Sequence, residues 1–295
     1  MSSPQIIAGA TGYGVWPANS IEGMLGCNAA ALDGVEIDVH LTADGHVVAH
    51  HDYGIAADHS RLGGAFLDAP GPLLRAATLA ELKAYDLGRP KPGSPYARRY
   101  PDRPGMDGVF MPTLPALLAA LAQAPGPRRK LFVEIKTDPL DYSESADPVA
   151  LLDAVLRDLR AADWTSDSKI IAFDWSVLRD LAAKAPEMAT AHLTVPDAMK
   201  PKVKLLANGD SPWVDGCDAR QFGGSELRAI QGHGGREWSP HISDITPERV
   251  AEAKALGLAV GVWGVATGVE IATLSVLGVE ALTVSGPAWS AAPQA

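Results

Sequence analysis

Cysteine is scarce in this chain, and a continuous apolar run long enough to cross a membrane is lacking. Cys27 and Cys217 are too few for a disulfide scaffold, so we predict that both are reduced, buried and structural. The longest uncharged stretch, residues 109–127, is interrupted by several prolines, which excludes it as a membrane-spanning helix.

Positive charge is also under-represented. The chain has 25 Lys and Arg against 35 Asp and Glu, a formal net charge of −10. An acidic surface repels phosphate backbones, so we expect no nucleic-acid partner, and an anionic substrate would need a local cation. The first basic side chain is Arg61, so the beginning of the chain lacks the positive charge of a secretory signal, and we expect a cytoplasmic protein.

Two nucleotide-binding motifs are lacking as well. Neither a Gly-x-Gly-x-x-Gly turn after the first predicted strand nor a P-loop occurs, so a dinucleotide-binding fold has no support. What the chain does have is an ordinary globular balance, with 47% hydrophobic and 20% charged residues. Its 295 residues suit one large barrel domain as well as two smaller domains.

Short apolar segments alternate with amphipathic segments along most of the chain. We predict helices at 21–32, 114–121, 148–159, 176–183, 247–256 and 268–277, and an irregular segment at 207–240. The predicted strands are 5–8, 35–41, 46–50, 130–135, 170–173, 191–194, 258–263 and 281–283. This alternation predicts a parallel sheet covered by helices, and the count favours a (β/α)₈ barrel.

Two features depart from an ideal barrel. The pair Asp44-Gly45 predicts a local hairpin, which a purely parallel barrel does not contain. Residues 52–110 are rich in Gly, Pro, Asp and Arg and contain one clear helix at 79–87, opened by a capping box at Thr78 and Glu81. Their core is too thin to stand alone, so we interpret them as an insertion within a single barrel domain at 1–295.

Polar side chains inside the apolar strands are the candidates for chemistry. Period two places Glu36, Asp38 and His40 on one strand face, and places Lys136 on the same face as Glu134. Carboxylates in apolar strands are costly unless a positive group meets them. Three together favour a hard divalent cation, Mg²⁺ or Ca²⁺, held by Glu36, Asp38 and Glu134. The alternative is that each carboxylate pairs with a Lys or Arg at the barrel rim.

Other candidate residues lie near these carboxylates. His50 and His51 end a strand, and the one that faces the carboxylates is a natural general acid or base, with a structural imidazole as the alternative. Lys136 either binds a phosphate oxygen or pairs with a carboxylate. His192 is expected to be a core histidine, and Trp263 either walls the pocket or plugs the barrel.

One long run and several shorter ones, in the same order along the chain, resemble the glycerophosphodiester phosphodiesterase family. The long run is Gly34-Val-Glu-Ile-Asp-Val-His-Leu-Thr-Ala-Asp-Gly-His-Val-Val-Ala-His-His-Asp52. The shorter runs are Met111-Pro-Thr-Leu114, Val133-Glu-Ile-Lys136, Phe173-Asp-Trp175, Trp238-Ser-Pro240 and Gly278-Val-Glu-Ala-Leu-Thr283. The resemblance covers nearly the whole chain.

The resemblance implies a distorted (β/α)₈ barrel with an insertion after the third strand. The implied activity is metal-dependent hydrolysis of a small glycerophosphodiester to an alcohol and glycerol phosphate. By resemblance, Glu36, Asp38 and Glu134 are metal ligands for Mg²⁺ or Ca²⁺. By the same resemblance, His50 is one of two catalytic histidines and Lys136 lines the phosphate site.

This chain also departs from the family pattern. The family has a His-Arg-Gly after its first strand, and these positions fall either at Gly9 and Ala10 or at Ile7 and Ala8. Alanine also stands at the family's Glu, Ser and Asn positions, which correspond to residues 18, 172 and 266. The replacements cluster where the pocket is expected, and the residues we expect to line that pocket are Gly9, Ala10, Ala18, Phe173, Trp263 and Ala266.

Three functional interpretations remain open on the sequence. The first is a phosphodiester hydrolase of this family with weakened or altered activity, because loss of one acid–base histidine typically costs about 10²–10⁴ in rate. The second is an inactive barrel that still binds a metal or a ligand. The third is a barrel whose hollowed pocket, natural or engineered, serves different chemistry. Phosphate-ester turnover with added Mg²⁺ or Ca²⁺ separates the first from the other two.

Overall fold

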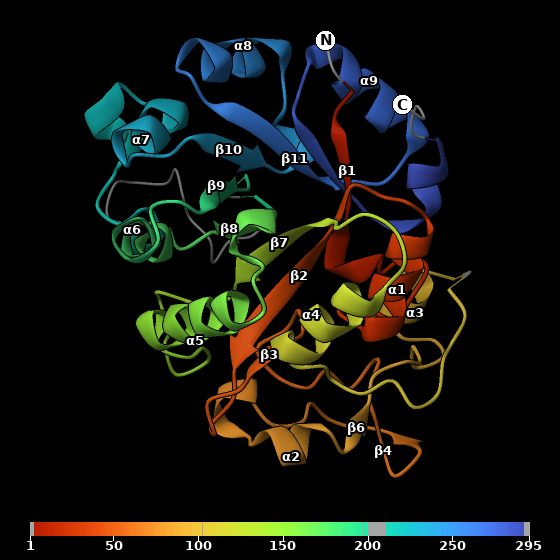
Figure 1. Ribbon diagram of the computed structural model, residues 1–295. Helices are drawn as coiled ribbons and strands as arrows, with labels where there is room; N and C mark the ends of the chain where they lie inside the picture. Colours follow the sequence, from red (N-terminus) through yellow and green to blue (C-terminus); the bar gives the residue numbers. More distant parts are fainter. Residues whose placement is uncertain (1–2, 102, 197, 200–210, 292–295) are drawn as a thin grey trace.

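The computed structural model describes residues 3–101, 103–196, 198–199 and 211–291, and it contains a closed parallel barrel (Figure 1). The barrel closes because the first strand pairs in parallel with both the second and the last. This architecture confirms the predicted (β/α)₈ barrel. Its strands in chain order are β1 (Gln5–Ala8), β2 (Gly34–Leu41), β7 (Lys130–Ile135), β8 (Ser168–Ala172), β9 (Ala189–Thr194), β10 (Glu237–Pro240), β11 (Ala259–Val265) and β12 (Ala281–Val284).

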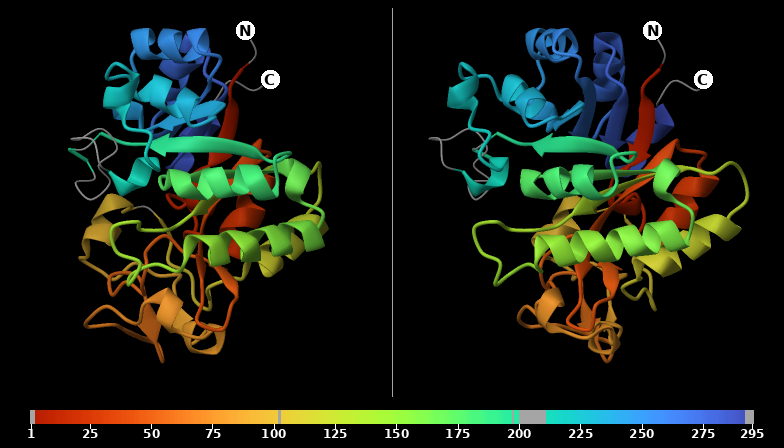
Figure 2. Two further views of the ribbon diagram at one scale, coloured as in Figure 1. Left: turned by 90° about the vertical axis from the view of Figure 1, so that its left-hand side faces the viewer. Right: turned by 60° about the vertical axis from the view of Figure 1, so that its left-hand side comes forward.

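Helices cover the outside of the barrel, as the green and blue ribbons in Figure 2 show. Several begin at the side-chain caps that the sequence predicts: Asp147 accepts a hydrogen bond from the amide of Ala150, and Thr246 accepts one from the amide of Arg249. The covering helices are α1 (Ile21–Ala29), α4 (Leu114–Gln123), α5 (Pro148–Ala161), α6 (Trp175–Lys184), α7 (Glu226–Gly232), α8 (Pro247–Ala255) and α9 (Gly268–Leu277).

The register of two neighbouring strands brings the candidate ligands together. Strand β2 pairs in parallel with β7 so that Asp38 lies opposite Glu134, and Glu36 lies two residues earlier on the same face. The intervening Ile37 and Val133 point the other way and are fully buried. Side chains opposite one another on parallel strands share a face, so all three carboxylates point into the barrel.

The hairpin expected at Asp44-Gly45 is present, and it corrects the predicted set of barrel strands. Strand β3 (Val47–Ala49) runs antiparallel to β2 and lies outside the barrel, so the predicted strand 46–50 is not one of the eight. The sixth barrel strand in chain order, β10, lies inside the predicted irregular segment 207–240, which also contains α7. Residues 207–210 of that segment fall outside the described residues.

The stretch after β3 forms a small unit of its own, at the lower end of Figure 1. Its apolar side chains pack into a separate cluster around Ile55, Leu74 and Leu82. The predicted helix 79–87 is too long: α2 ends at Leu82, because Tyr85 pairs with Leu62 as a strand. The elements of this insertion are β4 (Arg61–Leu62), β5 (Ala65–Phe66), α2 (Leu79–Leu82), β6 (Tyr85–Asp86) and α3 (Pro95–Arg99).

Three further expectations concern cysteines, membrane spans and surface charge. Both cysteines are free thiols, but only Cys27 is buried, whereas Cys217 is half-buried because it lies in a loop.

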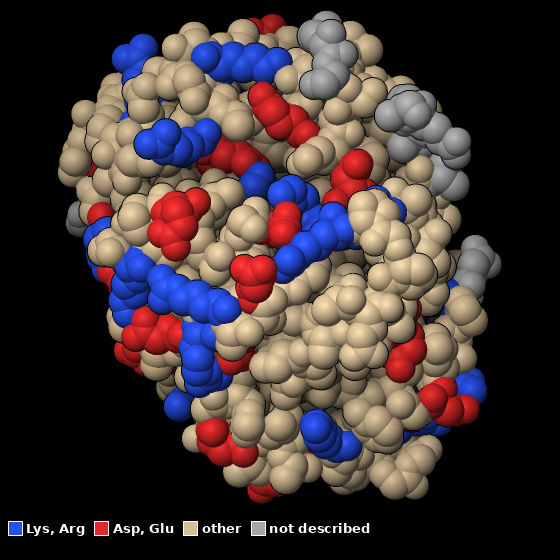
Figure 3. All heavy atoms as spheres, in the orientation of Figure 1, with Lys and Arg blue, Asp and Glu red and all other residues tan. Residues whose placement is uncertain are grey.

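Among the described residues, no helix combines the length and apolar character needed to span a membrane. On the face shown in Figure 3, basic side chains are interspersed with acidic ones, so the excess acidic charge is not concentrated there.

Candidate metal centre

Three carboxylates and one lysine form a buried cluster inside the barrel. Glu36, Asp38 and Glu134 each bring one carboxylate oxygen to within 4.8 Å of the others. The ammonium of Lys136 lies 2.8 Å from Asp38 Oδ1 and 2.6 Å from Glu134 Oε1. One lysine therefore neutralises only part of the cluster. The alternative, in which each carboxylate pairs with a Lys or Arg, holds for Asp38 and Glu134, which share Lys136, whereas Glu36 has no ion-pair partner among the described residues.

The loop after β1 orients two of these carboxylates. The amide of Ala10 donates to Glu36 Oε2 at 2.7 Å. The Asn19 amide group donates to Asp38 Oδ2 at 2.9 Å and accepts from the Asp38 backbone at 3.0 Å. Ala10 and Asn19 both have left-handed φ angles, of 41° and 52°. Such conformations are strained for residues other than glycine, and they persist here where they aim donors at the carboxylates.

Burial and mutual repulsion govern the protonation of the cluster. Burial, followed by the charges of Asp38 and Glu134, raises the pKa of Glu36 well above its usual value. Burial also opposes ionisation of Asp38, but the Lys136 ammonium, together with the hydrogen bonds from Lys136 and Asn19, holds the pKa of Asp38 below its usual range. Burial likewise opposes the charge of Lys136, yet the two carboxylates raise its pKa above its usual value.

A hard divalent cation fits this donor set. Glu36 Oε1 is buried and has no hydrogen-bond partner among the described residues. An unpartnered buried carboxylate oxygen is costly, and a cation would satisfy it and relieve the repulsion that raises the pKa of Glu36. Three carboxylate oxygens are the ligands that Mg²⁺ and Ca²⁺ prefer. Glu36, Asp38 and Glu134 would hold the ion.

His50 is buried beside the cluster, whereas His51 is exposed. The amide of His50 donates to the backbone oxygen of Asp38 at 3.0 Å, and its side-chain Nε2 is buried with no partner among the described residues. Burial, followed by the neighbouring His59, lowers the pKa of His50 to about 4. The exposed side chain of His51 contacts Asp52, at 2.7 Å between Nδ1 and Oδ1. His40 is buried beneath them against the ring of Tyr53.

The two pairs of positions at which the sequence places the family's His and Arg lie at different levels of the barrel. Ile7 is fully buried and lies opposite Gly34, so its side chain points into the barrel two residues below Glu36. Gly9 begins the loop at the level of Glu36, and a Cβ there would lie 3.4 Å from the ring of Tyr13 and 3.3 Å from Thr283. A side chain at position 9 would therefore reach the carboxylate level.

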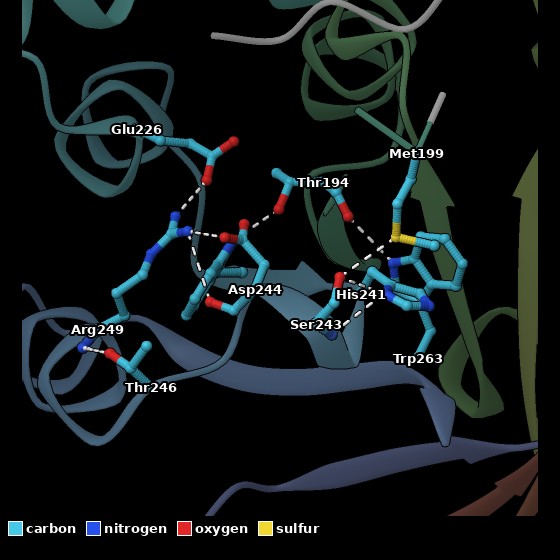
Figure 4. A network of polar contacts seen from close by, with 10 residues as sticks. Thr194, Met199, Glu226, His241, Ser243, Asp244, Thr246, Arg249 and Trp263 are labelled. Carbon is cyan, nitrogen blue, oxygen red and sulfur yellow. Dashed lines mark hydrogen bonds and ion pairs between the residues drawn. The ribbon is translucent and has the colours of Figure 1, made fainter. Parts of the chain in front are cut away.

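Two of the other expected pocket residues meet at the barrel mouth. The rings of Phe173 and Trp263 contact edge-to-face, with centroids 5.8 Å apart. Figure 4 shows His241 beside Trp263, with centroids 4.6 Å apart, and the Trp263 indole donating to the backbone oxygen of Thr194 at 3.2 Å. Phe173, His241 and Trp263 thus form an aromatic wall.

The alanines noted in the sequence are distributed unequally. Ala18 is half-buried and directly precedes Asn19, which holds Asp38. Ala266 is exposed, and its amide donates to Glu270 at the start of α9. Ala172 is fully buried in β8. Of the three, only Ala18 adjoins a residue that contacts the carboxylate cluster.

His192 is a core histidine, as expected. Strand β9 places it on the outer face, where its Nε2 lies 3.0 Å from His233 Nδ1 and its ring contacts Trp175. His233 in turn lies 3.3 Å from Asp215. Burial, followed by the charge of His233, lowers the pKa of His192 to about 3. His192 therefore stabilises the outer layer and lies on the opposite face of its strand from the carboxylate cluster.

A buried arginine of the insertion, Arg103, also belongs to the site region and has no signal in the sequence pattern. The Arg103 guanidinium donates to the backbone oxygen of Tyr13 at 3.3 Å and to the Tyr96 hydroxyl at 2.8 Å, and its Nε and Nη2 have no partner among the described residues. It also lines a cavity of about 310 Å³. Arg103 lies in an irregular segment that has neither hydrophobic periodicity nor a known motif. Its positive charge was the only feature of the sequence that could have indicated a role.

The fold and the site define a (β/α)₈ barrel that gathers carboxylates toward the carboxyl ends of its strands, the face that carries the active sites of barrel enzymes. The chain belongs to the Glycerophosphoryl diester phosphodiesterase family, whose model matches residues 9–288. No curated protein matches the chain.

Solved structures agree with this assignment. A protein of Silicibacter pomeroyi DSS-3 assigned to the glycerophosphoryl diester phosphodiesterases is 30% identical, with a TM-score of 0.84 over 97% of this chain and 91% of that chain. An Oleispira antarctica phosphodiesterase in complex with its product sn-glycerol-3-phosphate is 21% identical, with a TM-score of 0.70 over 98% and 96%. A glycerophosphodiester phosphodiesterase of Agrobacterium tumefaciens shares the fold at 16% identity, with a TM-score of 0.65 over 98% and 100%.

Proposed function

We propose that this chain is a metal-dependent phosphodiester hydrolase that acts on small glycerophosphodiesters with weakened or altered turnover. The observation that carries the proposal is the buried cluster of Glu36, Asp38 and Glu134, which shares one lysine and leaves an oxygen of Glu36 without a partner in the part of the chain that the structure describes. When bound, a divalent cation supplies charge neutralisation at the phosphate and activation of an attacking oxygen. Family membership supports a glycerophosphodiester as the substrate class.

Two side chains beside the cluster take the remaining roles. Lys136 keeps its proton, because Asp38 and Glu134 raise its pKa, and it offers a point charge to a phosphate oxygen. The amide of His50 donates to Asp38, its buried Nε2 has no partner among the described residues, and we assign it the proton exchange with the reacting oxygens.

Turnover is weakened because the loop after β1 provides no second imidazole and no guanidinium. We assign the family's His and Arg positions to Gly9 and Ala10, since Gly9 lies at the level of Glu36 and Ile7 lies below it. The aromatic wall of Phe173, His241 and Trp263, two of whose rings are apolar, supports the altered-substrate branch of the proposal. It favours a diester whose alcohol carries an apolar group.

Arg103 is the cation that we assign to the substrate's negative charge in place of the missing arginine. It reaches the loop after β1 through the backbone oxygen of Tyr13, whose ring adjoins Gly9. A buried guanidinium with two unpartnered nitrogens and no carboxylate within reach, among the described residues, is ready to bind an anion.

The test is hydrolysis of a simple glycerophosphodiester by the chelator-treated protein, with and without added Mg²⁺ or Ca²⁺. We expect slow, metal-dependent release of glycerol phosphate. Glu134→Gln removes one charged ligand and should lower metal affinity by roughly 10-fold or more, measured by calorimetry. Arg103→Met should raise KM for the diester, whereas Arg89→Met should not, because Arg89 lines the same cavity but is half-buried and already paired with Asp107.

A matched control for the ligand variant is Glu237→Gln. Glu237 is a buried barrel carboxylate paired with Lys169 at 2.5 Å, outside the three-carboxylate cluster. Metal affinity should be unchanged in this variant. Turnover that ignores added metal would remove the proposal, and turnover near 10 s⁻¹, typical of enzymes, would remove the weakened-activity part.

A further inference from the structure

A second cluster of potential metal ligands lies next to the carboxylate cluster, where the chain leaves β3 for the insertion. His50, Asp52 and His59 each offer one ligand atom, and these atoms lie within 4.8 Å of one another. His50 directly follows β3, and His59 lies shortly before β4. The two imidazole rings lie 5.8 Å apart between centroids. This set contains two nitrogens and one oxygen, whereas the barrel cluster contains three oxygens.

His50 supplies the observation that points to a ligand. Its side chain is 5% exposed, and its Nε2 has no hydrogen-bond partner among the described residues. A buried ring nitrogen without a partner is costly unless something absent from the protein alone satisfies it. The backbone of His50 is fixed by the hydrogen bond from its amide to the Asp38 oxygen. This bond fixes the main chain of His50 and leaves Nε2 available to a ligand.

The other two side chains are oriented as metal ligands usually are. Asp58 Oδ1 lies 2.8 Å from His59 Nδ1, which leaves His59 Nε2 for a ligand, and Tyr96 stacks on the His59 ring at 4.4 Å. Asp52 uses Oδ1 to contact His51, which leaves its second oxygen. A carboxylate behind a histidine fixes the ring and its tautomer, and this arrangement recurs behind ligating histidines.

We propose that His50, Asp52 and His59 form a transition-metal site, of the Zn²⁺ or Co²⁺ class, separate from the carboxylate cluster. Two imidazoles and one carboxylate suit these borderline cations, whereas carboxylates alone suit Mg²⁺ and Ca²⁺. Bonds of about 2.0–2.1 Å hold tetrahedral ligand atoms roughly 3.4 Å apart. Rotation of the half-buried Asp52 and His59 side chains closes the remaining gap.

Occupancy of this site would control the proposed hydrolysis. A bound transition metal takes the lone pair of His50 Nε2, the nitrogen that the proposed function uses to exchange a proton. Zn²⁺ should therefore inhibit turnover while Mg²⁺ or Ca²⁺ occupies the carboxylates. This consequence depends on the proposed function, whereas the site itself does not.

The test is titration of the protein with Co²⁺ in saturating Mg²⁺, followed by visible absorption and by calorimetry. We expect one Co²⁺ per chain with a visible d–d spectrum. His59→Ala should weaken Co²⁺ binding at least 10-fold, and Asp58→Asn, which keeps the imidazole, should weaken it about 10- to 100-fold. His46→Ala is the matched control and should bind normally, because His46 is an exposed histidine near an aspartate, 3.9 Å from Asp44.

The outcomes separate this site from the proposed function. Co²⁺ binding that survives in His59→Ala, or that disappears in Glu134→Gln instead, overturns the site. If the wild-type protein hydrolyses no diester but His59-dependent Co²⁺ binding is seen, the proposed function fails and the site stands. If Zn²⁺ inhibits hydrolysis in wild type and His46→Ala but not in His59→Ala, where residual turnover is measurable, both stand.

Discussion

The buried imidazole of His192 makes the free energy of unfolding depend on pH. Its pKa in the folded protein is about 3, against an ordinary value of 6.5, because burial and the neighbouring His233 oppose its charge. Below pH 6.5 His192 binds a proton in the unfolded chain but remains neutral in the folded chain until the pH approaches 3. This contribution to stability is therefore complete above pH 6.5 and is lost as the pH falls toward 3.

The variant His192→Gln removes this titration. Between pH 6 and pH 4 the wild type should lose up to about 1.4 kcal/mol of unfolding free energy per pH unit more than the variant does. Urea unfolding at several pH values measures the difference. The exposed His46→Gln serves as the control and should leave the slope unchanged. Parallel curves for wild type and His192→Gln would contradict the prediction.

The sequence predicts some site residues better than others, for a physical reason. Side chains alternate between the two faces of a strand, so a polar residue at an inward position interrupts an apolar pattern in the sequence. This interruption identifies Glu36, Asp38 and Glu134. Arg103 and His59 come from loops, which have no period, and their places depend on how the insertion packs onto the barrel. Long-range packing of this kind leaves no local signal in one sequence.

The sequence predicts the correct number of barrel strands, eight, but one of the predicted strands is not part of the barrel and one barrel strand was not predicted. The predicted eight included residues 46–50, which form the hairpin strand β3, and omitted β10. Strand β10 is short, begins with Glu237 and ends at Pro240, so it lacks the apolar run of its neighbours. Its polar Glu237 is satisfied by Lys169 across the barrel, a contact that no local pattern indicates.

The loop after β1 provides the sharpest element-scale prediction. The double variant Gly9→His with Ala10→Arg should raise diester turnover by about 10²–10⁴, because it restores an acid–base imidazole and a guanidinium at the carboxylate level. A Cβ at position 9 meets only side chains at 3.3–3.4 Å and a backbone oxygen at 3.6 Å, so small shifts accommodate it. Metal-supplemented hydrolysis of a simple glycerophosphodiester is the measurement.

The alternative register provides the control. Ile7→His with Ala8→Arg places polar side chains at two fully buried strand positions. We expect this variant to lose several kcal/mol of stability without gaining activity, because the new charge is buried without a partner. A gain in activity at positions 7 and 8, with none at positions 9 and 10, would reverse the assignment.

For the whole molecule, cation binding should stabilise the fold. The carboxylates come from two strands distant in sequence, so an ion at the cluster binds the folded barrel and not the unfolded chain. At 100 times its Kd an ion adds about 2.7 kcal/mol, which corresponds to a rise in Tm on the order of 5 °C. Thermal melts with Mg²⁺, Ca²⁺ and chelator measure the shift. Glu134→Gln should shrink it, and an equal shift in that variant would place the ion elsewhere.

The closure of the barrel between β1 and β12 has a consequence for biosynthesis. The ribosome releases β1 before the other barrel strands, and its partner at Ala281–Val284 follows as the last of them, about 14–55 s later at about 5–20 residues per second. Until then β1 has only its two-residue pairing with β2. The strands that carry the carboxylates are complete by Ile135, so the nascent chain holds the cluster's residues in an open sheet with an unpaired edge. Because the barrel closes only when β12 is made, each nascent chain needs protection of that edge. A chaperone or transient local pairing would provide it.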